Sequence, residues 1–217
     1  KKLNKGALWL VLGGAFVLRL LLAAITTGYS YDMGCFGAWA AKMAQTGPAA
    51  FYSEGYFADY PPGYLYVLGA VGAVQKIFGL DFDGAAFKML LALVPAVCDC
   101  AAAWLVAQLG QRCLPDGRGV LCLTAFAALH PAALFDTAVW KQIDGAFTLP
   151  ILLCFLLLET KNYLPAAIFY GIALSIKPQA LLFGPVLAAC FLAGIVLERD
   201  RLRAFGRCFV GAALAVL

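Results

Sequence analysis

Apolar stretches recur along this chain, and many approach the roughly 20 residues that a helix needs to cross the ~30 Å hydrocarbon core of a bilayer. The composition agrees, because 64% of the residues are hydrophobic and only 13% are charged, against about 25% charged in a typical soluble domain. We therefore expect an all-α, polytopic membrane protein. The candidate spans are Gly6–Ile25, Phe87–Leu109, Val120–Phe135, Ala146–Leu158, Leu164–Ile176 and Leu181–Leu197.

A further apolar run begins near Cys208 and reaches Leu217, which brings the expected number of spans to about seven. That run is shorter than a full span, and the chain starts with Lys1 rather than Met. We therefore expect these residues to be the N-terminal part of a longer protein whose C-terminal part is missing here, or only the ordered part of a longer protein. Residues 1–217 are interpreted as a single membrane module.

The segment Gly63–Phe78 decides which loops share a side of the membrane. If it spans the bilayer, 7 Lys and Arg residues lie on the side of the N-terminus and 8 on the other side. If it lies along the membrane surface, the count becomes 10 against 5, with Arg19 inside the first span left out of both counts. Cytoplasmic loops are enriched in Lys and Arg, which favours the surface position. The aromatic residues Tyr64, Tyr66 and Phe78 also suit an interface.

This topology places residues 26–86 outside the membrane, together with residues 136–145 and the turn Lys177–Gln179. The N-terminal lysines and Glu198–Arg207, which carries four arginines, are then cytoplasmic. A charge in a membrane protein is costly unless it lies in a loop, a cavity or a site. The outer side is therefore the predicted working face, and four carboxylates face it: Asp32, Asp59, Asp136 and Asp144.

Asp32 lies just beyond the first span, where both lipid head groups and aqueous substrates can reach it. A carboxylate in such a place can act as a general base toward a hydroxyl. The alternative is a solvated loop residue or a cap of the helix-like run Phe36–Ala44. Asp59 and its neighbour Tyr60 are likewise candidates for substrate contact, with the alternative that Asp59 caps the helix after Pro61 and Pro62.

The second external loop has the residue types of a sugar-binding surface. Aromatic faces, carboxylates and amides together recognise sugar hydroxyls, and all three occur in this short stretch. Trp140 is alternatively an interfacial anchor. The candidate sugar contacts are Asp136, Trp140, Gln142 and Asp144.

Two cations lie deep enough to meet a lipid phosphate. Lys177 precedes Pro178 and Gln179 where one span ends and the next begins. At this depth it can bind a lipid phosphate, with Gln179 beside it. The alternative is a lysine that snorkels to the membrane surface. Arg19 and Asp99 lie inside two spans at similar depths. A structural ion pair is expected between them, with contact of Arg19 to a donor phosphate as the alternative.

Other motifs mainly exclude functions. Neither a G-x-x-x-x-G-K-[ST] loop nor a strand–G-x-G-x-x-G–helix unit is present. Asp81-Phe82-Asp83 matches the D-x-D of soluble glycosyltransferases, but it lies on the predicted outer side, away from nucleotide sugars.

The only histidine, His130, is a poor basis for a metal centre, and the basic residues form no nucleic-acid patch. We expect no cofactor and no nucleic-acid partner, while a divalent metal stays open.

Taken in order, these motifs resemble the GT-C membrane glycosyltransferases. Their order is most similar to that in the glucosyltransferases that extend the dolichol-linked oligosaccharide and in their bacterial relatives. The motifs that carry this resemblance are an Asp after the first span, a helix bearing Trp39, Asp-Tyr-Pro-Pro, W-x-Q-x-D and a Lys-Pro-Gln turn. The resemblance covers Gly6 to about Leu197. It implies a GT-C bundle with juxtamembrane helices in the first external loop, Asp32 as the catalytic base, and Lys177 in the donor-phosphate region.

The leading hypothesis is an integral membrane enzyme of the bacterial plasma membrane. It transfers a sugar from a polyprenyl-phosphate carrier to a hydroxyl of a glycan, lipid or protein on the outer side, with inversion and with Asp32 as base. The alternative is a transporter or flippase of lipid-linked saccharides, which needs a polar path across the bundle although only Arg19 and Asp99 are deep. A non-catalytic scaffold leaves the clustered acids and Trp140 unexplained.

Overall fold

The described part of the chain is helical. The computed structural model describes residues 2–197, 203, 205–206 and 209–211, and none of these lies in a strand. The prediction of an all-α chain is confirmed. The elements follow in the order α1 (Lys5–Ile25), α2 (Ser30–Thr46), η1 (Pro48–Ala50), α3 (Pro62–Phe78), α4 (Ala85–Cys113), α5 (Gly117–Ala128), α6 (Pro131–Leu134), η2 (Phe135–Trp140), α7 (Asp144–Glu159), α8 (Tyr163–Ile176), η3 (Pro178–Phe183) and α9 (Gly184–Leu197).

Three stretches of the described chain are long and apolar enough to cross a membrane. They are α1, α4 and Gly117–Trp140, which combines α5, α6 and η2. Tyr163–Ile176 and Pro178–Ala193 are apolar but shorter. These helices confirm the prediction of a polytopic membrane bundle. The last predicted span, from near Cys208, lies mostly outside the described residues.

The chain forms two compact units. The first contains the residues up to Ala58 together with Leu65–Ala146, and the second contains Asp59–Tyr64 and the residues from Phe147 onward. The first unit therefore holds the two predicted external loops except Asp59–Tyr64, which belongs to the second unit.

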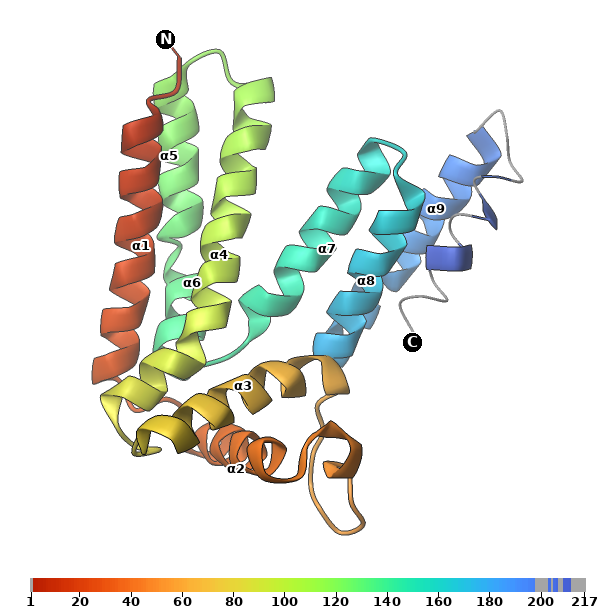
Figure 1. Cartoon of the computed structure of the whole chain (residues 1–217). Coiled ribbons are helices and arrows are strands. Elements are labelled where there is room, and N and C mark those ends of the chain that lie inside the picture. The colour runs from red at the N-terminus through yellow and green to blue at the C-terminus, as the bar shows by residue number, and fades with distance from the viewer. Residues whose placement is uncertain (1, 198–202, 204, 207–208, 212–217) are drawn as a thin grey trace. The chain divides into compact units, whose positions relative to one another are not determined.

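In the first unit, α1, α4 and α5 stand side by side (Figure 1). The α1 members of their common core recur at spacings of four and three residues, which places them on one helix face. Most of the facing residues are alanines, which allow helix backbones to approach closely in a membrane. The core consists of Leu8, Leu12, Ala15, Ala103, Ala107, Val120 and Ala128.

The remaining surface of α1 is apolar as well. Leu10 is 77% exposed and Ile25 is 79% exposed, and Trp9 and Leu21 are exposed too. Large apolar side chains along a helix surface suit lipid, since lipid tails are as apolar as leucine. The α1 helix therefore has a core-facing side and a lipid-facing side.

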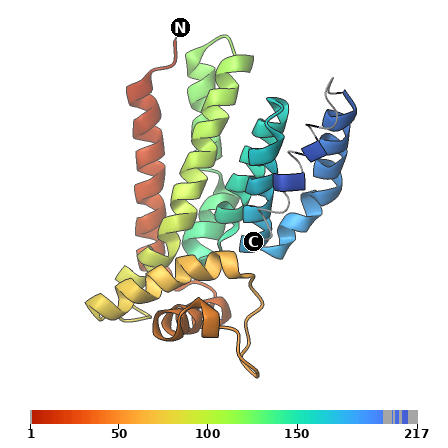
Figure 2. The ribbon, with the colours of Figure 1, turned by 45° about the vertical axis from the view of Figure 1, so that its right-hand side comes forward.

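The α2 and α3 helices run crosswise to α1 and α4, at the end where α1 finishes and α4 begins (Figure 1 and Figure 2). They pack closely because Gly72 in α3 has no side chain, and a Cβ atom there would collide with the carbonyl oxygen of Ala40 in α2. Gly69 lies against Met43 in the same contact. The helix predicted at Gly63–Phe78 is α3, and its place at a membrane surface stays a prediction.

The third spanning stretch is interrupted at Pro131. Proline has no N–H and disfavours the helical conformation in the preceding residue, so α5 ends at Ala128 and α6 begins after His130. The chain continues as the π-helical η2 as far as Trp140. The loop predicted from Asp136 therefore begins later, because residues 136–140 are helical. Single π-helical turns are frequent at functional sites.

The second unit contains α7, α8, η3 and α9 packed through two apolar clusters. Its contact with the start of α3 is close, because a Cβ atom on Gly63 would collide with the backbone of Ser175 near the end of α8. This contact places Asp59–Tyr64 beside the turn that follows α8. The clusters are Phe147, Ile151, Ala173 and Ala180, and Cys154, Ala166 and Leu187.

Candidate functional site

Asp32 lies in the first turn of α2 and is half-buried. The linker from α1 turns at Gly28, whose φ of 79° lies in the left-handed region that favours glycine. The helix starts after Tyr29, so the N-terminal end of α2, with its partial positive charge, lies next to the carboxylate. The end of α1 and the start of α2 thus position Asp32 at the end of the first unit where the crosswise helices lie.

Two side chains, one from the end of η2 and one from just after it, donate hydrogen bonds to Asp32. The Trp140 indole Nε1 donates to Oδ2 at 3.3 Å, and the Gln142 amide donates to the same oxygen. Both donors approach Oδ2, so Oδ1 has no donor among the described side chains. The three residues singled out separately in the sequence therefore form one cluster.

Aromatic rings lie beside this cluster. The Trp140 ring lies 5.7 Å from the rings of Tyr29 and of Phe135, measured between centroids. These rings, with Ile25 and Val139, line an open cavity of about 500 Å³. Trp140 is 42% exposed, so its indole can bind Asp32 and still offer a face to a ligand.

The segment after η2 is held by backbone contacts. The Gln142 N–H donates to the Asp136 carbonyl at 2.9 Å, and the Tyr29 N–H donates to the Trp140 carbonyl at 3.3 Å. Lys141 between them has φ 71°, ψ 30°, a left-handed conformation that costs an L-residue roughly 1–2 kcal/mol. Strained backbone of this kind persists where the surrounding contacts over-determine it.

The Lys141 side chain is buried although it is charged. It is 2% exposed, and its ammonium donates to the Thr26 hydroxyl and to the Ala138 carbonyl. Burial lowers the pKa of Lys141 to about 8, and the positive charge of Lys88 acts in the same direction. The sequence predicted only that Lys141 is external. A lysine between a Trp and a Gln in an aromatic-rich loop was the available signal for this contact.

Arg19 and Asp99 form the ion pair expected from their depths. Arg19 Nε lies 3.0 Å from Asp99 Oδ2, and Arg19 Nη1 donates to the Ala128 carbonyl at 2.7 Å. The Thr137 hydroxyl donates to the same Asp99 oxygen at 2.7 Å. This network joins α1, α4, α5 and η2, and Arg19 has no exposed surface. Thr137 was not predicted, because one threonine in an apolar stretch carries no distinctive pattern.

Asp136 and Asp144 flank the segment that carries Trp140 and Gln142. Asp136 lies in the first turn of η2 and Asp144 in the first turn of α7. An acid in the first turn of a helix is favourable because the N-terminal end is partially positive. Their predicted role as sugar contacts stays a prediction.

The other predicted residues gather in the second unit. Asp59, Tyr60, Pro178 and Gln179 line one cavity of about 380 Å³, together with two leucines of η3. Lys177 follows α8, is 7% exposed, and its ammonium lies 5.8 Å from the centre of the Phe147 ring, within the range of a cation–π contact. Phe147 was not predicted as a contact of Lys177, because a phenylalanine within an apolar span is normally interpreted as a core residue.

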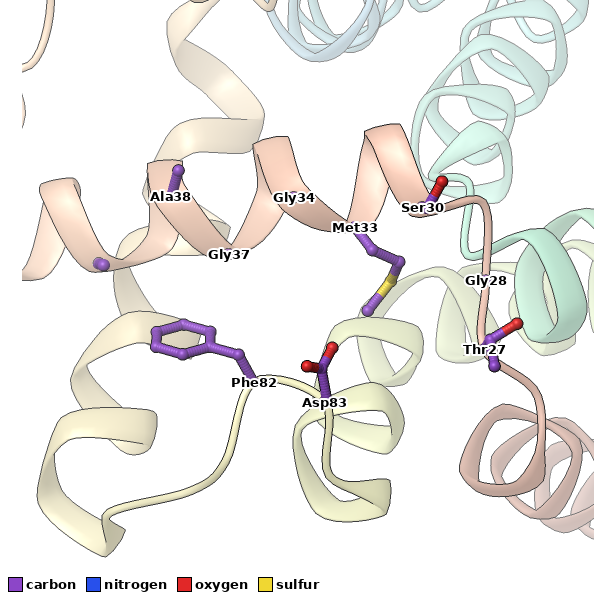
Figure 3. A pocket seen from close by; sticks show the side chains of 10 residues that line it. Thr27, Gly28, Ser30, Met33, Gly34, Gly37, Ala38, Phe82 and Asp83 are labelled. Carbon is purple, nitrogen blue, oxygen red and sulfur yellow. The ribbon is translucent and has the colours of Figure 1, made fainter.

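A further cavity lies along the other side of α2. Its lining includes Gly34, Gly37, Ala38 and Ala41, which stand roughly opposite Asp32 at 100° of helix turn per residue. Figure 3 shows the Phe82 ring beneath Gly37, with Asp83 near the Met33 side chain. The volume is about 450 Å³. Thr27 and Gly28 line both this cavity and the one beside Trp140.

Among the residues that the structure describes, no group of three or more His, Cys, Asp or Glu side chains is arranged to hold a metal ion. The candidate chemistry of the described residues therefore centres on two places. One is the Asp32 carboxylate with its two hydrogen-bond donors and the buried Lys141 beside them. The other is the cavity lined by the Asp59 carboxylate, the Tyr60 phenol and the Gln179 amide. Carboxylates, amides and aromatic rings are the groups that were expected to recognise a sugar.

A family model for Glycosyltransferase family 87 matches residues 57–217, which is well over half of the chain. The matched segment includes Asp59, Trp140, Gln142 and Lys177, while Asp32 precedes it. No match was found among the curated proteins or the solved structures. The resemblance to GT-C glycosyltransferases is confirmed, and the chain belongs to Glycosyltransferase family 87, a family of GT-C-type membrane glycosyltransferases.

Proposed function

We propose that this membrane glycosyltransferase moves a sugar from a polyprenyl-phosphate carrier to a hydroxyl acceptor, with Asp32 as the general base. Family membership supplies the reaction class, a transfer between a sugar donor and an acceptor. The observation that carries the assignment of Asp32 is its hydrogen bonding. Trp140 and Gln142 hold one carboxylate oxygen, and no described side chain donates to the other.

This arrangement suits a base because the two carboxylate oxygens have separate tasks. Two donors on Oδ2 fix the orientation of the carboxylate, and Oδ1 keeps its lone pairs for an incoming hydroxyl. A general base must lie within hydrogen-bond reach of the proton that it removes. The half-buried position of Asp32 leaves its carboxylate partly exposed, which supports this role.

The proposed step balances without a covalent intermediate. The acceptor hydroxyl gives its proton to Asp32 Oδ1 while its oxygen forms a bond to the anomeric carbon. The bond from that carbon to the phosphate oxygen breaks, and polyprenyl phosphate leaves with the electron pair. Attack from the side opposite the phosphate inverts the anomeric configuration. A phosphate leaving group needs little protonation, so Asp59 is assigned to sugar contact or structure.

We assign the donor phosphate to Lys177, whose charge-assisted contact with a phosphate oxygen would be stronger than a neutral one. Asp59, Tyr60 and Gln179 are assigned to sugar hydroxyls, which is supported by the cavity that they line together. The burial of Arg19 and its contacts with Asp99 and Ala128 favour a structural role over contact with phosphate.

We further propose that the reaction takes place on the outer side of a bacterial plasma membrane. Support comes from the distribution of Lys and Arg, 10 on the N-terminal side against 5 on the other when α3 does not span. Membrane lipids, a lipid-linked donor and a glycan, lipid or protein acceptor are the partners in this proposal. The transporter alternative gains no support, because the deep charges are paired with each other.

The test is a transfer assay with the purified protein in detergent or liposomes. It uses a panel of radiolabelled polyprenyl-phosphate hexoses and membrane extracts as a source of acceptors. The proposal expects label to move from donor to acceptor with the wild-type protein and not with Asp32→Asn. Movement of intact donor across liposome membranes without transfer would instead favour the transporter. Transfer that persists at the normal rate in Asp32→Asn would remove the assignment of the base.

A further inference from the structure

We propose that Lys141 is a positioning residue for the transfer reaction. Its side chain fastens the end of η2 to the end of α1 and thereby holds Trp140 and Gln142 against Asp32. This role rests on the proposed function of Asp32. It adds a residue that takes no part in substrate contact and acts through its two neighbours.

The backbone at Lys141 places its neighbours on the same carboxylate. Residues on either side of an extended position point to the same face but stand about 6.6 Å apart, two residue rises of about 3.3 Å, whereas Trp140 and Gln142 both reach the single atom Asp32 Oδ2. The left-handed turn at Lys141, with φ 71°, brings them together. A lysine rarely adopts this conformation, and contacts of the Lys141 side chain hold it together with the backbone hydrogen bonds of Gln142 and Trp140.

Those contacts join two elements that are far apart in the chain. The ammonium donates to the carbonyl of Ala138, one of the last carbonyls of η2, and to the hydroxyl of Thr26 at the end of α1. The last carbonyls of a helix lack partners within the helix, and a cation at that end is favourable. The Thr26 hydroxyl also bonds the Ala138 carbonyl at 2.9 Å. The three groups form a closed set of contacts.

The linker from α1 leaves space for this side chain. A Cβ atom at position 28 would lie 2.9 Å from Lys141 Cγ and 2.8 Å from Met33 Cγ. The absence of a side chain at Gly28 therefore lets the methylene stem of Lys141 pass beneath the linker. The Lys141 side chain is therefore buried along its whole length, from its left-handed backbone to its hydrogen-bonded ammonium.

The experiment reads the contact between Trp140 and Asp32 directly. Protein containing 5-fluorotryptophan gives ¹⁹F resonances for its four tryptophans, and Trp140→Phe identifies the resonance of Trp140. Asp32→Asn should shift this resonance in the wild-type background, because the indole N–H bonds the carboxylate. The proposal expects Asp32→Asn to have no effect on it in the Lys141→Met background. An Asp32→Asn shift of wild-type size in Lys141→Met would overturn the proposal.

Lys161→Met is the matched control. Lys161 also has a left-handed backbone, with φ 58°, but its side chain is exposed, so the Asp32→Asn shift should persist in this background. Thr26→Val is the second variant, because it keeps the shape of the residue and removes one of the two acceptors of the ammonium, the one on α1's C-terminal end. If Lys141→Met does not fold, loss of the Asp32→Asn shift in Thr26→Val supports the proposal, and its persistence overturns it.

Kinetics separate positioning from binding. Misplacement of catalytic groups lowers turnover by up to about a hundredfold, so Lys141→Met should lower kcat at least tenfold while KM for the donor stays within a factor of two. A rise in KM with unchanged kcat would contradict positioning. The ¹⁹F measurement needs no donor, so it decides the role of Lys141 even if the transfer assay fails with every donor.

Discussion

The Gln142 side-chain amide donates a hydrogen bond to Asp32 Oδ2 across 110 residues of sequence. The donor lies within the segment that matches family 87, and the acceptor lies before it. The candidate base is therefore oriented by a segment that follows the third spanning stretch. Its chemistry depends on two parts of the chain that are remote in sequence and joined in the first unit.

Asp32→Asn should abolish turnover while leaving donor binding intact. The amide keeps the shape and the hydrogen-bonding capacity of the side chain but cannot take a proton, and loss of a general base typically lowers rates by about 10²–10⁴-fold. The measurement is transfer of labelled sugar, with donor affinity determined in parallel by binding to detergent-solubilised protein. Asp81→Asn is the control, because Asp81 is an exposed acid of the α3–α4 loop.

The same assay distinguishes Asp32 from Asp59. Asp59→Asn should raise KM for the donor more than it lowers kcat, because Asp59 is assigned to sugar contact. Near-normal turnover in Asp32→Asn together with an inactive Asp59→Asn would transfer the role of base to Asp59.

Removing one member of the Arg19–Asp99 pair should destabilise the protein more than removing both. A single charge left buried without its partner costs about 3–5 kcal/mol, whereas apolar replacement of a whole buried pair is often close to neutral. Arg19→Met and Asp99→Leu should therefore each lower the free energy of unfolding, and the double variant should lower it less than the sum. Unfolding in mixed detergent micelles gives these values. Additive losses would mean that the two charges do not interact.

Thr137→Val provides a graded comparison in the same network. It removes one hydrogen bond to a charged group, which is worth about 1.5–3 kcal/mol, and leaves the ion pair in place. Its loss of unfolding free energy should be smaller than that of either charge variant.

Much of the helical fold could be predicted because the bilayer imposes a simple length rule on apolar sequence. The first predicted span, Gly6–Ile25, differs from α1 by one residue. The span predicted at Leu164–Ile176 differs from α8 in the same way. The interruption before Pro131 and the π-helical turn after it were not predicted, because hydropathy averages over a window and does not register a change in hydrogen-bond pattern.

The site could be predicted only as separate residues. Asp32, Trp140 and Gln142 each carry a recognisable chemistry, but their contact depends on how α2 lies across the end of the bundle. Lys141 was missed as a structural residue because lysine is rarely left-handed, and its burial depends on the Thr26 hydroxyl and on the Ala138 carbonyl near the end of η2. No local pattern in the sequence encodes that combination.

Lys177→Met should weaken donor binding. Loss of one charge-assisted contact with phosphate costs about 1.5–3 kcal/mol, which corresponds to roughly a tenfold to hundredfold loss of affinity. The measurement is binding of a non-transferable polyprenyl-phosphate analogue. Lys161→Met, which removes an exposed lysine of the same unit, should bind as the wild type does. Unchanged affinity in Lys177→Met would show that the phosphate lies elsewhere.

Labelling from the two sides of the membrane should place the ends of α4 on opposite sides. Asp83 is exposed before the start of α4, and Cys113 is exposed at its end. In a protein otherwise without cysteine, an impermeant maleimide should label Asp83→Cys in intact cells. The protein that keeps only Cys113 should be labelled after permeabilisation alone. The reverse pattern would place Asp32 on the cytoplasmic side and remove the proposed outer active site.

The lowered pKa of Lys141 should make stability rise with pH over a defined window. The pKa is about 8 in the folded protein against an ordinary value of 10.5, so between these pH values the unfolded chain binds more protons than the folded one. Stability therefore increases as pH rises through this window, and this contribution is lost as pH falls through about 8. The cause is the burial of the ammonium, aided by the nearby charge of Lys88.

Other groups also titrate in this range, so the quantity to measure is the difference between wild type and Lys141→Met. The free energy of unfolding in mixed micelles should rise more steeply with pH from about 8 to about 10 in the wild type than in the variant, which has no proton to lose at this position. Removing the repulsion of a second cation with Lys88→Gln should raise the pKa of Lys141 and move the start of the rise to higher pH. Parallel pH dependences in wild type and Lys141→Met would mean that the ammonium of Lys141 is not buried in the folded protein.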